Sequence, residues 1–437
     1  MSFSSFFAGL SGLQANSDRL SVIGNNLANV NTVGFKASRV TFQDIFSSEG
    51  ASFNGAGNPL QVGRGTQVGG IDSVFSQGSL QSTNVLTDMS IQGDGFFVLR
   101  DPSGELSYSR AGNFSFDADG FMTAPSGQIL QGFTVPDANG NIPVSGAAND
   151  IQIPTGLTAS PRATESFNGF INLNAVAQVD DPATLTTEAA EVFSTSVNVY
   201  DSLGTRHTVT LNFTPVDTTV PADGALDEWT YEVTVPGEDV SGGTAGTPTV
   251  IGTGTIDFDA NGQLSTPSNN IALNFPAWSN GASAQTIDWE LFDANGGGIL
   301  TGFAGPSSLS SSNQDGFGVG LLRTLTIDAD GLISGLFTNG SSVELARVVL
   351  GTFNNTNGLL RDGANGFLET SNAGLATIGA PNSGGRGVVT ANTLELSNVD
   401  ITKEFTNLII SQRGYQANSR IITTTDEITQ EALTLKR

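Results

Sequence analysis

The sequence contains no cysteine and only one histidine among its 437 residues. Without a thiol the chain cannot form a disulfide, a thiolate metal site or a cysteine nucleophile. The single histidine, His207, also excludes metal sites that need several histidines. The absence of cysteine fits a protein of the cytosol, and it equally fits an exported protein that travels unfolded without cross-linking.

Positive charge is scarce, because 17 lysines and arginines stand against 42 aspartates and glutamates, for a net charge of -25. Such a chain repels the phosphates of nucleic acids and anionic lipids, so we expect neither as a partner. No apolar run is long enough to predict a transmembrane helix or membrane insertion. The first basic residue is Arg19, so the sequence does not predict the basic start of a signal peptide.

Apolar residues at helical spacing mark both ends of the chain. Near the N-terminus they are Phe3, Phe6, Leu10, Leu13, Leu20, Ile23, Leu27 and Val30. Near the C-terminus they are Ile401, Phe405, Leu408, Tyr415, Ile422, Ile428 and Leu433. Steps of three, four and seven residues place these side chains on one helix face. We predict two amphipathic helices that pair as a coiled coil, and that pack against other copies because one seam buries too little surface.

The first predicted helix ends in an amide-rich stretch, "NNLANVNTVGFKASR", with Asn25, Asn26 and Asn29 where soluble helices usually carry charge. Asparagine can donate and accept hydrogen bonds at once, so it can pair with its own copy in an assembly, whereas like charges would repel. The alternative is that asparagine weakens the helix before Gly34 ends it. Both interpretations are open, and we favour assembly because both chain ends carry a seam.

Between its ends the sequence changes to period two, as in "FFVLR" and "WTYEVTV", and 54 glycines supply many turns. We therefore predict a mainly β fold with α-helical termini and two nested β-rich domains. The predicted parts are a terminal helical coiled-coil domain at 1–33 and 393–437, an extended connector at 34–71, a discontinuous inner β domain at 72–150 and 310–392, and an inserted outer β domain at 151–309.

Five aspartates begin the sequence Asp-Ala-(Asp or Asn)-Gly, namely Asp117, Asp137, Asp259, Asp293 and Asp328. Carboxylates before a glycine suggest a calcium loop, but neither Asp117 nor Asp328 has the glutamate that such a loop needs at its twelfth position. Asp-Gly and Asn-Gly instead suit hairpin turns, which require positive φ angles. We interpret all five as turns.

The remaining candidates for chemistry carry little signal. His207 has no G-x-S-x-G nucleophile elbow to serve, and we interpret it as an ordinary surface or edge histidine. Trp229, Trp278 and Trp289 could stack against a sugar, although buried strand aromatics are commoner. Two acids flanking a glycosidic bond could hydrolyse it, but the sequence singles out no pair. We predict no catalytic, cofactor-binding or metal-binding residue.

Four segments resemble one known family. "SVIGNNLANVNTVGFKAS" is similar to the N-terminal signature of the rod and hook axial proteins of the bacterial flagellum, and "NVDITKEFTNLIISQRGYQANSRIITTTDEI" is similar to their C-terminal helix. "IQGDGFFVL" and "LGTFNNTNGLL" resemble their first β domain. The long insert with "VNVYDSLGTRHTVTLNF" resembles the hook branch of this family, whereas distal rod proteins lack so large an insert.

The resemblance implies a structural protein that assembles in many copies into a helical tube, with the terminal helices lining a channel. In the hook, such a tube is a universal joint that transmits torque from the rod to the filament. The resemblance also implies export by the flagellar type III apparatus to an extracellular location, and four partners: the distal rod, the hook cap, the hook–filament junction protein and the export gate. It implies no cofactor. Alternatives are a distal rod protein, an acidic secreted adhesin and a carboxylate-dependent hydrolase.

The connector contains "FQDIF", in which Phe42 and Phe46 lie four residues apart. The pair resembles the Phe-x-x-x-apolar signal with which early flagellar substrates dock to the export gate, because an extended segment can present both side chains to a groove. Alternatively, the two rings pack the connector against the tube wall. The two roles remain open, and one pair of residues could serve both at different times.

Overall fold

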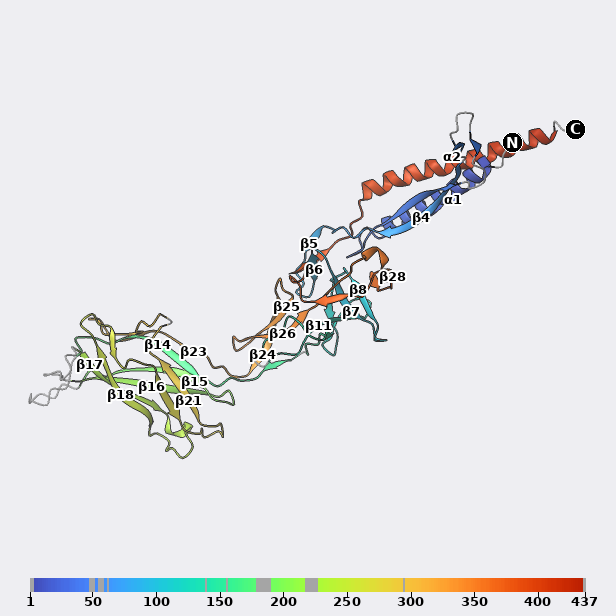
Figure 1. Cartoon of the computed structure of the whole chain (residues 1–437). Helices are drawn as coiled ribbons and strands as arrows, with labels where there is room; N and C mark the ends of the chain where they lie inside the picture. Colours follow the sequence, from blue (N-terminus) through green and yellow to red (C-terminus); the bar gives the residue numbers. More distant parts are fainter. Residues whose placement is uncertain are drawn as a thin grey trace, which may run out of the picture. The chain divides into compact units, whose positions relative to one another are not determined.

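The computed structural model describes residues 4–46, 52–53, 59–60, 63–137, 140–154, 156–177, 190–216, 227–293 and 295–434. These residues are mainly β, with one α-helix near each end, α1 (Ser4–Ala28) and α2 (Ile401–Thr434), which pack against each other (Figure 1). The predicted fold class is confirmed. Phe3 lies outside the described residues, and so do the side chains of Phe46 and Leu433.

The chain divides into two compact units. The helix-bearing unit comprises Met1–Thr155, Thr324–Gly335 and Val343–Arg437, and the inserted unit comprises Gly156–Arg323 and Leu336–Ser342. Along the sequence, the second unit therefore interrupts the first. The finer division predicted above, with its separate coiled-coil domain and connector, stays a prediction.

The helix-bearing unit is built mostly from short strands. They are β1 (Ser38–Phe46), β2 (Ser52–Phe53), β3 (Pro59–Leu60), β4 (Gly63–Ser73), β5 (Leu80–Ser82), β6 (Met89–Gln92), β7 (Phe96–Arg100), β8 (Leu106–Ser109), β9 (Ser115–Phe116), β10 (Met122–Thr123), β11 (Ile129–Phe133), β12 (Asn149–Asp150), β27 (Leu350–Thr352), β28 (Leu360–Gly363), β29 (Gly366–Leu368), β30 (Thr377–Gly379), β31 (Val388–Ala391) and β32 (Thr393–Glu395), with a 3-10 turn at Thr356–Gly358. Strands β24 (Gly320–Ile327), β25 (Leu332–Phe337) and β26 (Ser342–Val348) have residues in both units.

The main sheet of this unit runs in the order β26-β11-β7-β8-β29-β28, and β27 pairs with β7. Its core is aromatic: Phe96 packs against Phe367 with ring centroids 5.8 Å apart, and Tyr108 packs edge-on against Phe353 at 4.7 Å. Edge-to-face rings of this kind add to the apolar area that they bury. This core fixes the hairpin β28–β29, which forms one wall of the pocket considered below.

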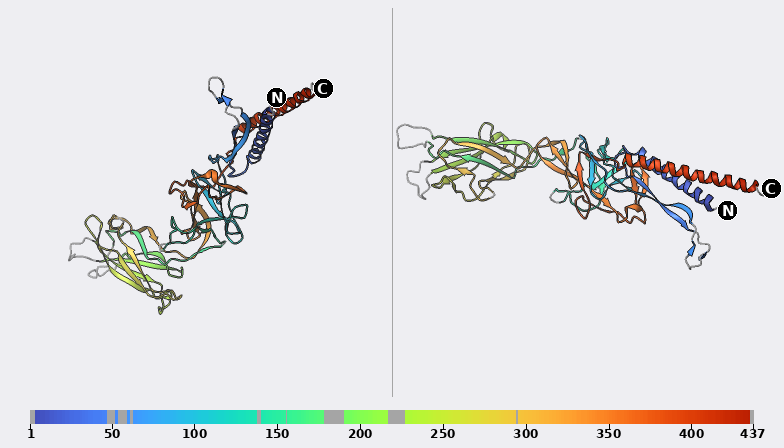
Figure 2. Two further views of the ribbon diagram at one scale, coloured as in Figure 1. Left: turned by 45° about the vertical axis from the view of Figure 1, so that its right-hand side comes forward. Right: turned by 90° about the horizontal axis from the view of Figure 1, so that it is seen from above.

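Strands β1 and β4 pair antiparallel, with Phe42 opposite Val68. The segment 34–71 was predicted to be an extended connector, and the structure adds this pairing. The ribbon packs on α1, where Oγ of Ser11 accepts a hydrogen bond from the backbone N–H of Thr66 at 3.2 Å. Figures 1 and 2 show β4 beside α1 from three directions. The first helix therefore has a β ribbon as well as α2 for a neighbour.

The end of α1 and the start of α2 are each fixed by a local feature of the chain. After α1 the chain turns at Gly34, whose φ of 69° is left-handed and whose missing Cβ leaves room for the backbone of Ala111. Helix α2 begins after Asp400, whose carboxylate accepts the backbone N–H of Lys403 at 3.1 Å and caps the helix. Among the described residues, no helix has the length and apolar content needed to cross a membrane.

In the part of the inserted unit that the structure describes, the regular elements are strands apart from one 3-10 turn at Gly237–Asp239. Its strands are β13 (Thr158–Ala159), β14 (Ser166–Asn172), β15 (Phe193–Tyr200), β16 (Arg206–Pro215), β17 (Asp227–Val235), β18 (Thr249–Phe258), β19 (Leu264–Thr266), β20 (Ile271–Phe275), β21 (Gln285–Glu290), β22 (Leu300–Thr301) and β23 (Ser308–Gln314). One 5-stranded sheet runs β15-β16-β17-β18-β19, and the other runs β20-β21-β14-β22 with β23 beside β14. Trp229, Trp278 and Trp289 are buried in this unit, as expected for strand aromatics.

The interpretation of His207 as a surface or edge histidine is wrong. The alternating burial along β16 turns its side chain inward, where it is 4% exposed and stacks on Trp278 with centroids 3.8 Å apart. Its two ring nitrogens lie 3.1 Å from carboxylate oxygens of Asp239 and Asp201. Both ring nitrogens of His207 are therefore held by side chains of its own unit.

The aspartate repeats form the turns that were predicted. Oδ1 of Asp117 accepts hydrogen bonds from the backbone N–H groups two and four residues later, at 3.0 and 2.8 Å. Asp259, Asp293 and Asp328 repeat both bonds, and Asp137 accepts the second. These carboxylates therefore shape their own loops.

The stability of the inserted unit should depend on Asp201 in acid. Burial alone would raise the pKa of this carboxyl, but hydrogen bonds from Asn280, His207 and two backbone N–H groups lower it below its ordinary value. A lowered folded pKa contributes stability that is present above the unfolded value of about 3.9 and is lost as the pH falls through the folded value.

We therefore expect Asp201→Asn to be less stable than the unsubstituted chain at pH 6, and the difference to shrink below about pH 4. Urea unfolding followed by tryptophan fluorescence measures this, since all three tryptophans lie in the inserted unit. The matched control is Asp288→Asn, which changes an exposed aspartate of the same unit. A difference that stays constant from pH 6 to pH 3 would contradict the prediction.

Candidate assembly site at the terminal helices

Glycines let α1 and α2 approach each other closely. A Cβ added to Gly12 of α1 would lie 2.7 Å from the side-chain nitrogen of Asn418 on α2. A Cβ added to Gly414 of α2 would lie 2.9 Å from the side-chain oxygen of Asn16 on α1. Both distances are shorter than van der Waals contact, so a larger residue at either position would require the facing asparagine side chain to move. Sequence periodicity, which weighs large apolar residues, missed them.

The predicted seam of α1 is covered in part. Ile23 is buried, Leu10 is 47% exposed, and the other described members are half-buried. These half-buried residues are Phe6, Leu13, Leu20, Leu27 and Val30. The single chain thus covers the α1 seam incompletely.

The predicted seam of α2 is more exposed in the single chain than the seam of α1. Leu408 and Ile422 are half-buried, whereas four members are exposed: Ile401, Phe405, Tyr415 and Ile428. Three further isoleucines that the predicted stripe omitted are also exposed, at 56% for Ile409, 54% for Ile410 and 42% for Ile421. A helix that exposes apolar side chains on several sides is typical of one that is covered by other molecules.

Asn26 acts within its own chain. Its side chain is 1% exposed, its Nδ2 donates to the carbonyl of Ser38 at 2.8 Å, and its Oδ1 accepts the N–H of Ser38 at 2.9 Å. This amide therefore joins the end of α1 to the start of β1, a role the sequence analysis did not predict. Asn25 is exposed, and Asn29 donates to the carbonyl of Asn25 at 2.9 Å. Pairing of asparagine amides between copies stays a prediction.

A buried ionic cluster lies where the chain leaves α1 and where it approaches α2. The ammonium of Lys36, 2% exposed, lies 2.6 Å from a carboxylate oxygen of Glu395, which is fully buried. The other oxygen of Glu395 lies 3.5 Å from the guanidinium of Arg110. Burial lowers the pKa of Lys36, and the hydrogen bond and charge of Glu395 oppose that shift. The paired carboxylate is what allows these cations to be buried.

Hydrogen bonds to backbone groups extend this ionic cluster. Lys36 also donates to the carbonyl of Ser76 at 2.8 Å, and Glu395 accepts the N–H of Gly78 at 2.8 Å. Asn398, just before α2, donates to the carbonyl of Val74 at 2.7 Å. Three segments, after α1, after β4 and before α2, are thereby joined. The sequence offered one sign of this cluster, namely that Lys36 is one of few lysines in the chain. That sign does not identify the residue with which Lys36 pairs.

Phe42 lies on β1 and is 41% exposed. It therefore remains accessible on the ribbon, and its partner in the proposed export signal, Phe46, has a side chain outside the described residues. Export and packing both stay predictions for this pair.

Four family models match separate parts of the chain. The "Flagella basal body rod protein" model matches residues 8–36, and the "Flagellar hook protein FlgE/F/G D1 domain" model matches residues 90–165. The "Flagellar basal body protein FlaE D2 domain" model matches residues 172–317, and the "Flagellar basal body rod FlgEFG protein C-terminal" model matches residues 390–435. Together these matches include most of α1, all of α2 and most of the inserted unit.

Full-length relatives decide the family. The flagellar hook protein FlgE of Treponema pallidum is 36% identical over 99% of this chain and 99% of its own length. The chain belongs to the flagellar hook protein family. The hook proteins of Borreliella burgdorferi and Salmonella typhimurium are 34% and 31% identical, each over 99% of this chain. A crystal structure of Helicobacter pylori flagellar hook protein FlgE2 aligns with a TM-score of 0.47 and 15% identity, over 69% of this chain and 98% of that chain.

In this hook-family chain, Glu395→Gln should destabilise the helix-bearing unit, because it leaves Lys36 and Arg110 without the carboxylate between them. Removing one partner of a buried ion pair costs about 3 to 5 kcal/mol. We expect calorimetry to show a lower melting temperature, and hydrogen exchange at Gly78 to become faster. The control, Asp362→Asn, removes an exposed carboxylate from the same unit. Equal effects of the two substitutions would show that the cluster does not stabilise the unit.

Proposed function

We propose that this chain is the structural subunit of the flagellar hook, and that many copies assemble through α1 and α2 into a flexible tube. The observation that carries the proposal is identity of 36% to a hook protein along 99% of both chains. A distal rod protein is disfavoured, because the inserted unit is shared with hook relatives over their full length. The proposed role is structural, without a catalytic site.

The exposed apolar residues on the helices support assembly through them. Ile409 and Ile410 are each more than half exposed, and Phe7 on α1 is 57% exposed. Leaving these side chains in water forgoes about 1.5 kcal/mol or more for each, which burial against another copy would recover. The glycine-lined contact between α1 and α2 keeps the pair narrow, so that several pairs can pack around one axis.

Apart from α1 and α2, both units consist mainly of strands, and these β units suit the universal-joint role. A joint that bends while it rotates needs contacts between subunits that are weak and adjustable. The chain has 54 glycines, and polar, glycine-rich surfaces suit weak and adjustable contacts better than apolar ones. We propose that the helices hold the tube together and that the β units slide during bending.

The proposal also covers the partners of the hook subunit and its route of export to the hook. A hook tube stands between the rod and the filament, so its ends would contact the distal rod, the hook cap during growth and the hook–filament junction protein. We propose export through the flagellar type III apparatus, for which a chain without cysteine is suited because it cannot cross-link while unfolded.

Replacing two exposed isoleucines tests assembly. The double variant Ile409→Ser plus Ile410→Ser should fold normally, because both side chains are exposed in the single chain. It should need a concentration roughly 100-fold higher to polymerise, from the loss of about 3 kcal/mol of apolar burial. Electron microscopy and sedimentation measure this.

The control for that experiment is Gln412→Ser plus Gln416→Ser, which alters two exposed polar residues on the same helix. We expect this control to form tubes at the wild-type concentration. Equal polymerisation by the isoleucine variant and the control would remove these residues from the interface.

The double variant Phe42→Ala plus Phe46→Ala tests the export signal. We expect it to accumulate inside the cell, while the purified protein still forms tubes, because the signal acts on the unfolded chain before assembly. Immunoblots of cells and medium measure export, with Ile71→Ala, an exposed apolar residue of the same ribbon, as the control. Normal secretion together with weakened assembly would assign the two rings to packing.

A further inference from the structure

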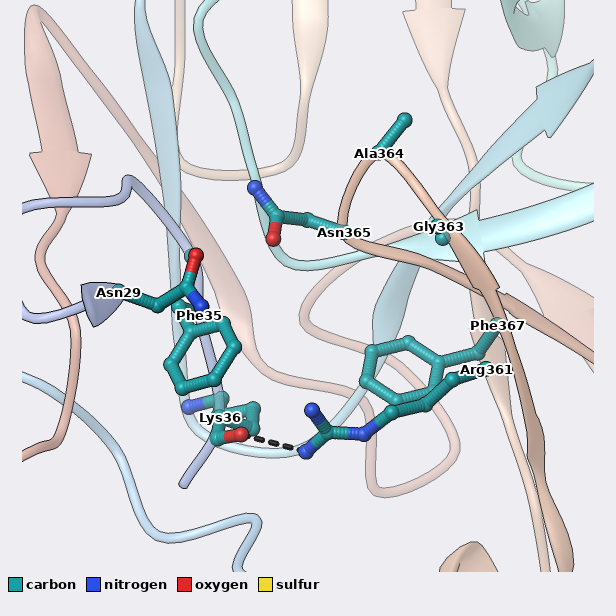
Figure 3. A pocket seen from close by; sticks show the side chains of 10 residues that line it. Asn29, Phe35, Lys36, Arg361, Gly363, Ala364, Asn365 and Phe367 are labelled. Atoms are coloured by element: carbon teal, nitrogen blue, oxygen red, sulfur yellow. Dashed lines mark hydrogen bonds between the residues drawn. The ribbon is translucent and has the colours of Figure 1, made fainter. Parts of the chain in front are cut away.

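A pocket of about 190 Å³ lies in the helix-bearing unit, between the turn after α1 and the hairpin β28–β29. Its walls include Asn29 and Phe35 on one side and Arg361, Asn365 and Phe367 on the other (Figure 3). At about 30 Å³ for each water, the pocket holds roughly six waters, which is room for one side chain. No residue of α1 or α2 lines this pocket.

Two charged residues line this pocket, Lys36 and Arg361, and only Arg361 has no ion pair with a residue that the structure describes. Its Nε donates to Oγ of Ser73 at 3.1 Å, and one terminal nitrogen donates to the carbonyl of Lys36 at 2.5 Å. Both acceptors are neutral, and Arg361 makes no ion pair among the residues that the structure describes. Lys36 differs, because Glu395 neutralises it. Burial lowers the pKa of Arg361, and no carboxylate opposes that shift.

The guanidinium is held in place by two aromatic rings. Its central carbon lies 5.3 Å from the ring centroid of Phe35 and 5.9 Å from that of Phe367. Figure 3 shows its other terminal nitrogen pointing into the space between these rings, away from the carbonyl of Lys36. An arginine fixed by stacking, with donors still free, is the arrangement that binds a carboxylate strongly at protein interfaces.

The charge of the chain indicates what fills the pocket. The sequence has 42 acidic residues against 17 basic ones, so any second copy presents many carboxylates and few cations. Arg361 lines a pocket large enough for a side chain and is stacked between two rings, and it has no ion pair among the described residues. We propose that the pocket receives an aspartate or glutamate side chain from a neighbouring copy, whose carboxylate pairs with Arg361. This inference rests on the proposed assembly and names one contact within it.

Carbodiimide coupling tests the contact directly. The variant Arg361→Lys keeps the positive charge and supplies an amine, which carbodiimide joins to a carboxylate that touches it. Copies labelled with nitrogen-15 and unlabelled copies are assembled together, coupled and digested. We expect mass spectrometry to find mixed-isotope peptides that join position 361 to one acidic residue, in tubes and not in monomers. The background is low, because the native lysines are Lys36, Lys403 and Lys436.

The control for coupling is Arg323→Lys, on an exposed arginine of β24 outside the pocket. We expect it to give at most one tenth of the mixed-isotope product. A product within one copy only, no product at position 361, or equal yields from the two variants would overturn the proposal.

A second measurement uses assembly itself. Arg361→Gln removes the charge, and we expect it to raise the polymerisation concentration at least ten-fold. Ser73→Ala removes one hydrogen bond of Arg361 but leaves the charge, and we expect a change below two-fold. Similar effects of the two variants would mean that Arg361 only braces the hairpin, and would overturn the proposal.

The two proposals fail in different ways. If the unsubstituted chain forms no tubes, the proposed function is wrong, and the contact that rests on it is wrong as well. If the unsubstituted chain forms tubes but Arg361→Lys gives no product between copies, only the pocket contact is wrong.

Discussion

The placement of both helices depends on the buried ion pairs that Glu395 makes with Lys36 and Arg110. A carboxylate without solvent costs several kcal/mol unless cations reach it, so the segment before α2 can settle only when Lys36 and Arg110 arrive with it. Lys36 follows α1, and the chain leading to α2 follows Glu395. The segment that follows α1 and the segment that precedes α2 are therefore joined by one ion pair, although Lys36 and Glu395 are 359 positions apart in the sequence.

From that anchor, the helix pair divides its contacts by size. The small residues, such as Gly12 and Gly414, face the partner helix of the same chain, and large residues, such as Ile409 and Phe405, remain exposed. Small residues bring two backbones close but bury little apolar area. Under the proposed assembly through α1 and α2, this arrangement leaves the large apolar side chains of the helices for contacts between subunits.

Local spacing predicted the features that depend on near neighbours. Apolar steps of three and four residues predicted the helices, and Asp-Ala-Xaa-Gly predicted turns such as the one at Asp117. The pairing of β1 with β4 was missed, because Gly65 and Gly69 reduce strand propensity and the segment between the strands, residues 47–62, is too long to read as a tight hairpin turn. The partner of Lys36 could not be predicted, because pairing across 359 positions leaves no periodic signal. The burial of His207 could not be predicted, because the sequence did not show which face of β16 packs against the core.

The aspartate turns also affect how the chain behaves as a colloid. Backbone N–H groups, led by that of Gln263 for Asp259 and that of Gly297 for Asp293, lower the pKa of these exposed carboxyls. They stay ionised in acid that protonates ordinary carboxyls, whose pKa values are about 4. Their retained charge shifts the isoelectric point downward, so that unassembled copies repel one another, and resist precipitation, in more acidic water than the acid content alone allows.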